Sequence, residues 1–145
     1  MAAKHLYILN PDHSVKLVDL RTWYAWMCEE KERDPWLQRR LVALTQVNSE
    51  IKVSTVFLGM DHNFLGGPPE IFETMVFGGP LADECVRYST WAQAEQGHAV
   101  IVDRVQAAIE RGADIVKDII ERAQGRDHPK GNNGGYPRPP KGREA

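Results

Sequence analysis

Polar side chains with the chemistry of a binding site gather within residues 52–91. Asp61 and Asn63 open a glycine- and proline-rich loop between two apolar runs, 53–58 and 71–77. Carboxylate and amide groups can hydrogen-bond hydroxyls such as those of a ribose. Asp and Asn also commonly close turns on their own backbone. The stretch therefore predicts a binding surface, with a purely structural turn as the alternative.

Three arginines could hold an anionic group. Arg87 lies near the end of an apolar run, and Arg104 and Arg111 are seven residues apart on one face of a predicted helix. A guanidinium binds phosphate oxygens through two parallel hydrogen bonds, which a lysine cannot do. The two helix arginines could reach a pocket between helix and sheet, or cross a two-fold interface. The alternative is a set of solvated surface charges, as most such arginines are.

The spacing of the acidic and histidine residues does not indicate a catalytic site. Asp61, His62, Glu73, Glu95 and His98 are residue types from which metal-hydrolase sites are built. They do not form an HExxH pattern, and the chain has no nucleophile elbow, P-loop or GxGxxG motif. We therefore expect no catalytic residue, metal ligand or cofactor. A hydrolase of a nucleotide signal remains an alternative.

Composition excludes several classes of partner. The net charge of −2 over 145 residues argues against binding a nucleic-acid polymer. Residues 125–145 hold five Lys or Arg and two Asp or Glu, so the rest of the chain is acidic. Any anionic ligand must then be captured by a few local cations. No apolar run predicts a membrane span. Cys28 and Cys85 are isolated, which favours a reducing cytosol.

Most of the chain before residue 90 is expected to form an antiparallel sheet. Each predicted hairpin consists of two apolar runs separated by turn formers. The paired runs are 4–9 with 15–18, 40–47 with 51–58, and 71–77 with 84–88. Asp19 can cap a short helix whose apolar stripe is Leu20, Trp23, Tyr24 and Met27, ending near Glu32 to Pro35.

From Thr90 the apolar period becomes helical. Thr90 and Gln93 fit a capping box, and apolar residues then recur every three or four positions up to Ile119. A helix over about 90–124 would be roughly 50 Å long. A domain of this size is only about 30 Å across. A second copy of the chain is the simplest cover for its far half, so we expect a homo-oligomer. The alternative is a helix that folds back on its own sheet.

These patterns predict an α+β fold with one domain over residues 1–124. An antiparallel β-sheet packs with a short helix and a long C-terminal helix. Residues 125–145 contain nine Gly or Pro and almost no apolar side chains, so they are expected to be a disordered basic tail.

Three blocks resemble a family of phage proteins. The blocks are STVFLGMDHNF, FETMVFGG and RYSTW, followed by a helix, and together they cover roughly a third of the chain. They resemble the phage Thoeris anti-defence proteins of the first type. That family binds and sequesters a cyclic ADP-ribose-type immune signal in the host cytosol, and some members also hold cyclic oligonucleotides. The resemblance implies a nucleotide sponge that makes and breaks no bonds.

The resemblance also implies roles for individual residues. Phe77 would stack on the base, and Arg104 on the long helix would hold the phosphates. Arg87, Arg111, Asp61 and Asn63 are the further candidates. The alternative for Phe77 is a core position, alternating with Met75 and Glu73 on one face of a strand. The tail and the loop 65–70 depart from the family pattern. An alternative interpretation of the whole chain is that it is a dimeric interaction module that blocks a host protein.

Overall fold

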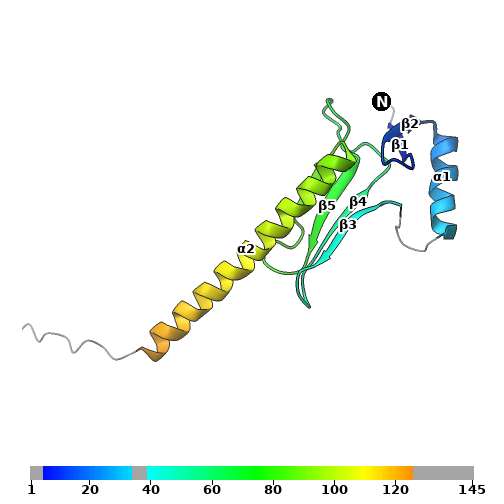
Figure 1. Ribbon diagram of the computed structural model, residues 1–145. Helices are drawn as coiled ribbons and strands as arrows, with labels where there is room; N and C mark the ends of the chain where they lie inside the picture. Colours follow the sequence, from blue (N-terminus) through cyan, green and yellow to red (C-terminus); the bar gives the residue numbers. More distant parts are fainter. Residues whose placement is uncertain (1–4, 34–38, 126–145) are drawn as a thin grey trace, which may run out of the picture. The chain divides into compact units, whose positions relative to one another are not determined.

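The computed structural model describes residues 5–33 and 39–125 (Figure 1). The chain divides into two compact units, Met1–Arg111 and Gly112–Ala145. The division falls within the long helix. The predicted tail lies outside the described residues, apart from Gly125. No helix in the described part of the chain is long and apolar enough to cross a membrane.

The first unit contains two antiparallel sheets, which confirms the predicted α+β class. One has two strands, β1 and β2, and the other has four in the order β3-β4-β5-β6. All three predicted hairpins are present, because each short turn returns the chain beside the strand it has just left. The strand bounds are β1 Leu6–Leu9, β2 Val15–Val18, β3 Leu41–Gln46, β4 Lys52–Phe57, β5 Phe72–Phe77 and β6 Cys85–Tyr88.

Only one face of the four-stranded sheet is covered by helix α2 (Trp91–Gln124). Alternate side chains of the two central strands are buried: Val53, Thr55 and Phe57 on β4, and Phe72, Thr74 and Val76 on β5. Successive residues of a strand point to opposite faces. The intervening residues, including Phe77, therefore lie on the face that α2 does not cover.

Helix α1 (Leu20–Arg33) begins and ends close to the predicted residues. The backbone N–H of Thr22 donates to Asp19 Oδ1 at 2.8 Å, which satisfies one of the free donors of the first turn. The predicted end extended as far as Pro35, which lies outside the described residues.

Only part of the apolar stripe predicted for α1 packs against the rest of the protein. Leu20 and Tyr24 are exposed, whereas Trp23 and Trp26 hold the helix in place. Trp23 Nε1 donates to the carbonyl of Gly59 at 2.9 Å, and Trp26 packs edge-on against a buried ring of β4. Trp23 belongs to the predicted stripe and Trp26 lies beside it, so the stripe predicted one of the two contacts.

The start of α2 forms the predicted cap with one difference. The N–H of Gln93 donates to Thr90 Oγ1 at 3.1 Å. The Gln93 side-chain oxygen accepts from the N–H of Ser89, one residue before the expected partner. In the following turns the buried residues are Ala94, His98, Ile101 and Val105, which confirms the helical apolar seam over the sheet.

His98 lies in the core between α2 and the sheet. Its Nε2 is hydrogen-bonded to Thr45 Oγ1 at 2.8 Å and its Nδ1 to Thr55 Oγ1 at 2.7 Å. Thr55 is in turn hydrogen-bonded to Thr74. The chain of hydroxyls fixes the ring and joins α2 to three strands. His98 is therefore a satisfied core residue.

Burial lowers the pKa of His98 below its ordinary value of 6.5, because the apolar surroundings disfavour the imidazolium. The unfolded chain takes up a proton near pH 6.5 before the folded one does. The contribution of His98 to stability is therefore complete above pH 6.5 and declines as the pH falls below it, by at most about 1.4 kcal/mol per pH unit.

We expect the free energy of unfolding of His98→Gln, measured with urea, to depend less on pH between 7.5 and 5.5 than that of the wild type. An identical pH dependence in the two proteins would contradict this.

Candidate functional site

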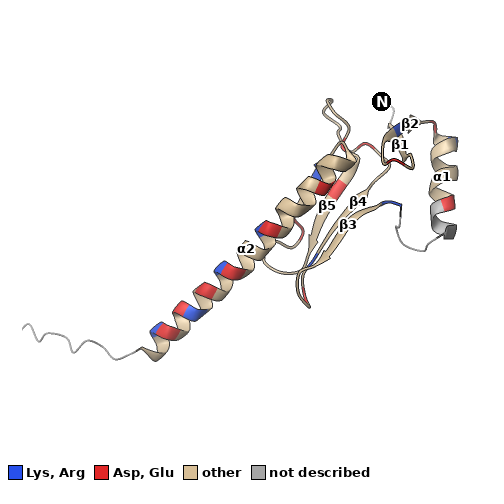
Figure 2. Cartoon of the chain, viewed as in Figure 1, with Lys and Arg blue, Asp and Glu red and all other residues tan. Residues whose placement is uncertain are grey.

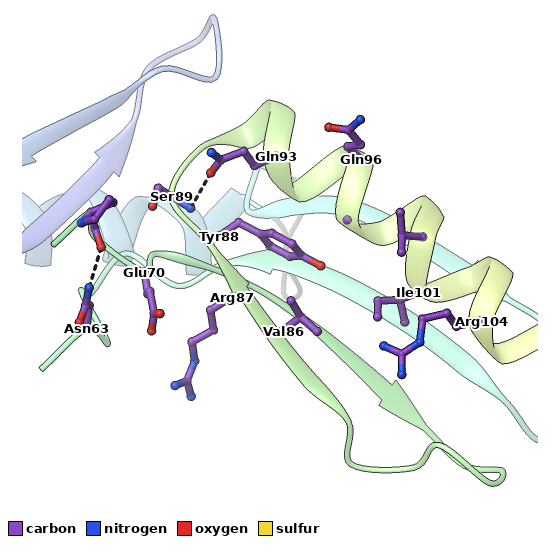
Figure 3. Close-up of a pocket in the computed structure, with 13 residues that line it drawn as sticks. Asn63, Glu70, Val86, Arg87, Tyr88, Ser89, Gln93, Gln96, Ile101 and Arg104 are labelled. Carbon is purple, nitrogen blue, oxygen red and sulfur yellow. Dashed lines mark hydrogen bonds between the residues drawn. The ribbon is translucent and has the colours of Figure 1, made fainter. Parts of the chain in front are cut away.

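A pocket of about 660 Å³ lies along the outer edge of the sheet (Figure 3). Its walls are the loop after β4, strand β6 and one side of α2. The lining residues of α2 run from Gln93 to Arg104, a length of about 16 Å. The volume is in the usual range for small-molecule sites. The residues that line it are Asn63, Pro68, Glu70, Val86, Arg87, Tyr88, Ser89, Gln93, Gln96, Gly97, Val100, Ile101 and Arg104.

The aromatic member of the pocket is Tyr88, which the sequence did not single out. Its ring lies between β6 and α2 (Figure 3). A Cβ at Gly97 would clash with the ring and the hydroxyl, so a glycine in the middle of the helix is what makes room for Tyr88. The hydroxyl is buried and has no hydrogen-bond partner within the described residues. A tyrosine three residues before a helix start, with a helical glycine nine residues after the tyrosine, was the signal that could have found this pair.

Each arginine of the pocket is paired with a carboxylate. Arg104 Nη1 lies 2.6 Å from Glu84 Oε1, with the two side chains 52% and 26% exposed. Arg87 Nε donates to Glu73 Oε2 at 3.0 Å. This hydrogen bond is the main cause that raises the pKa of Arg87 above its ordinary value. The sequence predicted both arginines as anion-binding residues, and both are among the lining residues. The Arg87 side chain, however, pairs with Glu73 and points away from α2 and Arg104 (Figure 3).

Charge is mixed over the whole of α2. Lysines and arginines alternate with acidic residues along the helix, without a patch of one sign (Figure 2). The pocket itself combines Arg87 and Arg104 with Glu70 in its lining. An anion is therefore attracted by direct contact with a guanidinium and not by a broad field.

Phe77 does not line this pocket. Its side chain is 45% exposed at the end of β5, and Lys52 Nζ lies 5.1 Å from the centre of the ring. It projects from the face of the sheet that α2 leaves uncovered, whereas Arg104 lies on α2. Within one protomer the two residues that the family resemblance combined are not brought together. Phe77 is not buried in the core either, so the alternative given for it is wrong.

The backbone conformation and close packing explain why glycine is needed at the two positions after Phe77. Gly78 and Gly79 have φ of 79° and 74°, a conformation that side chains rarely adopt. A Cβ at Gly78 would clash with the Glu50 carbonyl, and one at Gly79 would clash with Ile51. At these two glycines the backbone closely approaches the turn of the neighbouring hairpin in the same chain. These glycines place no free backbone in front of a ligand.

Asp61 and Asn63 organise the loop on which they lie. Asp61 Oδ1 accepts from the N–H of Asn63 at 2.8 Å and from that of Glu70 at 2.9 Å, which closes the loop at its base. Asn63 Nδ2 donates to the carbonyls of Gly66 and Pro68 at 3.0 and 2.9 Å. These hydrogen bonds agree with the alternative in which Asp61 and Asn63 close a structural turn, because they occupy Asp61 Oδ1 and the Asn63 amide nitrogen. Asn63 also reaches the edge of the pocket, whereas Asp61 does not line it.

Arg111 is exposed and lies outside the pocket lining. It is the last residue of the first unit. Of the six predicted site residues, the structure therefore places Arg87, Arg104 and Asn63 at one pocket and leaves Phe77, Asp61 and Arg111 out of its lining.

A second cavity of about 690 Å³ lies beside the N-terminal hairpin and the first turn of α2. Trp26 and Trp91 form much of its wall, and His13 stacks on Trp91 with ring centres 3.7 Å apart. Its lining contains one arginine, Arg39. Two arginines beside amide groups make the pocket at β6 better suited to a phosphate-bearing ligand.

Within the described residues no three His, Cys, Asp or Glu side chains are grouped so that they could hold a metal ion. A scan against protein-family models, a search of curated proteins and a search of solved structures each found no match. The site is therefore interpreted from its own geometry.

Proposed function

We propose that this protein is a phage anti-defence sponge that binds a cyclic ADP-ribose isomer, or a related cyclic nucleotide, in the pocket between β6 and α2. It holds the ligand without chemistry and so withholds it from a Thoeris effector in the host cytosol. The observation that carries the proposal is the pocket itself, which is walled by Tyr88 and has Arg104 of α2 and Arg87 of β6 among its lining residues.

The pocket offers each kind of contact that a nucleotide needs. The Arg104 guanidinium suits a phosphate, because it can give parallel hydrogen bonds to phosphate oxygens. The side-chain amides of Gln93 and Gln96 can bond ribose hydroxyls or the edge of a base. Stacking of a base on an aromatic ring is worth about 1–3 kcal/mol, and nanomolar binding needs about −12 kcal/mol. Several of these contacts must therefore act together.

We further propose that the protein acts as a homo-oligomer. Beyond Arg111 the apolar residues of α2 are Ile115, Val116, Ile119 and Ile120, and each is between 46% and 60% exposed. They recur at helical spacing and form one stripe, here called the distal stripe. A second copy of the stripe is the simplest cover.

A second candidate function is supported by the position of β6. It is the outer strand of the four-stranded sheet, and it pairs only with β5 within the described residues. A groove between an edge strand and a helix can accept an extended peptide as an added strand. The alternative is therefore an interaction module that captures a segment of a host protein in the same groove.

Analysis of what the protein releases on heat denaturation distinguishes a sponge, an enzyme and an interaction module. The protein is purified after incubation with extract of cells in which the defence system is active, then denatured, and the supernatant is analysed by mass spectrometry and by an effector-activation assay. A sponge returns an intact nucleotide that activates the effector. Release of a cleaved nucleotide would identify an enzyme. A supernatant without nucleotide, together with a co-purified host protein, would favour the interaction module.

A further inference from the structure

The outer edge of β6 carries main-chain groups that the sheet does not use. In an antiparallel pair, alternate residues bond to the neighbouring strand, and the residues between them direct their N–H and C=O away from it. The N–H of Val76 on β5 donates to the carbonyl of Glu84 at 3.2 Å. Because Thr74 pairs with Val86, the same alternation bonds Val86 to β5 and directs the N–H and C=O of Arg87 to the open edge.

This open edge faces the pocket between β6 and α2. Two residues beyond Arg87, the N–H of Ser89 donates to the side-chain oxygen of Gln93, a lining residue of α2, at 3.1 Å (Figure 3). Residues two apart on a strand point the same way, so the Arg87 N–H is directed to the same side. No hydrogen-bond partner is found for it among the described residues. The Arg87 side chain turns to Glu73 on the uncovered face, so the pocket meets the main chain of Arg87.

We propose that the main chain of Arg87 reads the base of the bound nucleotide. Its N–H donates to a ring nitrogen, and its C=O accepts from an amino group beside that nitrogen. Adenine offers such a pair of groups, because its 6-amino group lies between the acceptors N1 and N7. The ligand class is therefore a 6-aminopurine nucleotide, whose base bonds to the edge as an added strand would. The inference rests on the proposed function, because it concerns the same pocket.

The spacing along the groove fits a base at Arg87 and a phosphate at Arg104. Tyr88, the residue after Arg87, lies against Gly97 on α2. Arg104 is seven residues beyond Gly97, which is about 10 Å along the helix. Glu84, the partner of Arg104, is three residues before Arg87, which is also about 10 Å along the strand. The ribose of a nucleotide separates its base from its phosphate, so one ligand can meet both groups.

Amide hydrogen exchange of the full-length protein, followed by NMR, tests this assignment directly. In the free protein the N–H of Arg87 should exchange rapidly, and that of Val86, which bonds to β5, should exchange slowly. Adenosine 5′-monophosphate (AMP) at about ten times its Kd should slow exchange at Arg87 about tenfold, a limit set by the unbound fraction. Ribose 5-phosphate, which has the phosphate and no base, should leave the Arg87 N–H unprotected.

Ligand analogues and a pair of variants locate the contact. The 1-deaza and 7-deaza analogues of AMP each lack one acceptor, and the analogue without the acceptor that is used should bind about three- to tenfold more weakly. Arg87→Ala removes the side chain alone, whereas Arg87→Pro also removes the N–H. Proline is tolerated where the N–H of an edge strand faces outward. Arg87→Pro should bind AMP about three- to tenfold more weakly than Arg87→Ala, and both should bind ribose 5-phosphate equally.

Several results would overturn the inference. They are the absence of AMP binding, AMP binding that leaves the Arg87 N–H unprotected, and equal affinities for AMP and both analogues. Protection of that N–H in the free protein would also overturn it, because another strand would then cover the edge. The exchange measurement needs no variant, so it holds if Arg87→Pro fails to fold. Heat release of an intact nucleotide is a separate measurement, so the sponge stands if the base is held elsewhere. AMP protection of Arg87 without any released nucleotide would instead keep this inference and remove the sponge.

Discussion

Replacing Arg104 by alanine is expected to abolish retention of the nucleotide. Arg104 is one of the two cations that line the pocket. Hydrogen bonds to charged groups are worth about 1.5–3 kcal/mol, so the affinity should fall about 10- to 100-fold. Titration calorimetry with the ligand recovered by heat release measures this loss. The melting temperature should change by only a few degrees, because the Arg104 side chain is 52% exposed and its pair with Glu84 is a surface ion pair.

Arg111→Ala is the matched control for this experiment. It removes the same charge from the same helix, at an exposed position outside the pocket lining. Binding should remain close to that of the wild type if contact and not net charge determines affinity. An Arg104→Ala variant that still protects the signal from the effector would mean that the pocket assignment is wrong. Equal losses in the two variants would instead indicate a site that spans an interface between subunits.

The second large effect is expected from Ile115→Asp, which should dissociate the oligomer. Ile115 lies in the distal stripe and is 60% exposed in the single chain. A carboxylate placed in an apolar contact between two helices must be desolvated, at a cost of several kcal/mol. The molecular mass in solution, measured by light scattering during gel filtration, should fall to that of one chain. Circular dichroism should show that the helix content is largely kept.

Gln106→Asp provides the comparison for the assembly experiment. It introduces the same charge at an exposed position of α2 that is not part of the distal stripe. Its mass should equal that of the wild type. An unchanged mass for Ile115→Asp would show that the distal stripe is not the contact between copies.

The hairpins and the long helix could be predicted from the sequence because their signals are local. Turn formers between apolar runs and the capping pair Thr90 and Gln93 need no knowledge of the rest of the fold. The alternate burial of β4 and β5 follows from the same pattern. The stripe predicted for α1 was only partly right, because burial of a helix face depends on tertiary contacts. Trp23 and Trp26 reach the sheet, while Leu20 and Tyr24 remain exposed.

The site was less predictable for a different reason. Arg87 and Arg104 were identified by residue type, and the pocket that both line depends on β6 lying beside α2, which spacing does not encode. Phe77 was misplaced relative to the pocket because neither its position at a strand end nor the glycines after it indicates which face of the sheet is free. Tyr88 was missed because its role depends on Gly97, a residue that has no chemistry of its own.

The central claim is that the pocket between β6 and α2 holds an intact cyclic nucleotide. Calorimetric titration of the wild-type protein against a panel of cyclic ADP-ribose isomers and cyclic oligonucleotides tests it most directly. We predict nanomolar binding of at least one cyclic ADP-ribose isomer, with the ligand recovered unchanged afterwards. The absence of binding heat with every member of the panel, or recovery of a hydrolysed product, would contradict the account.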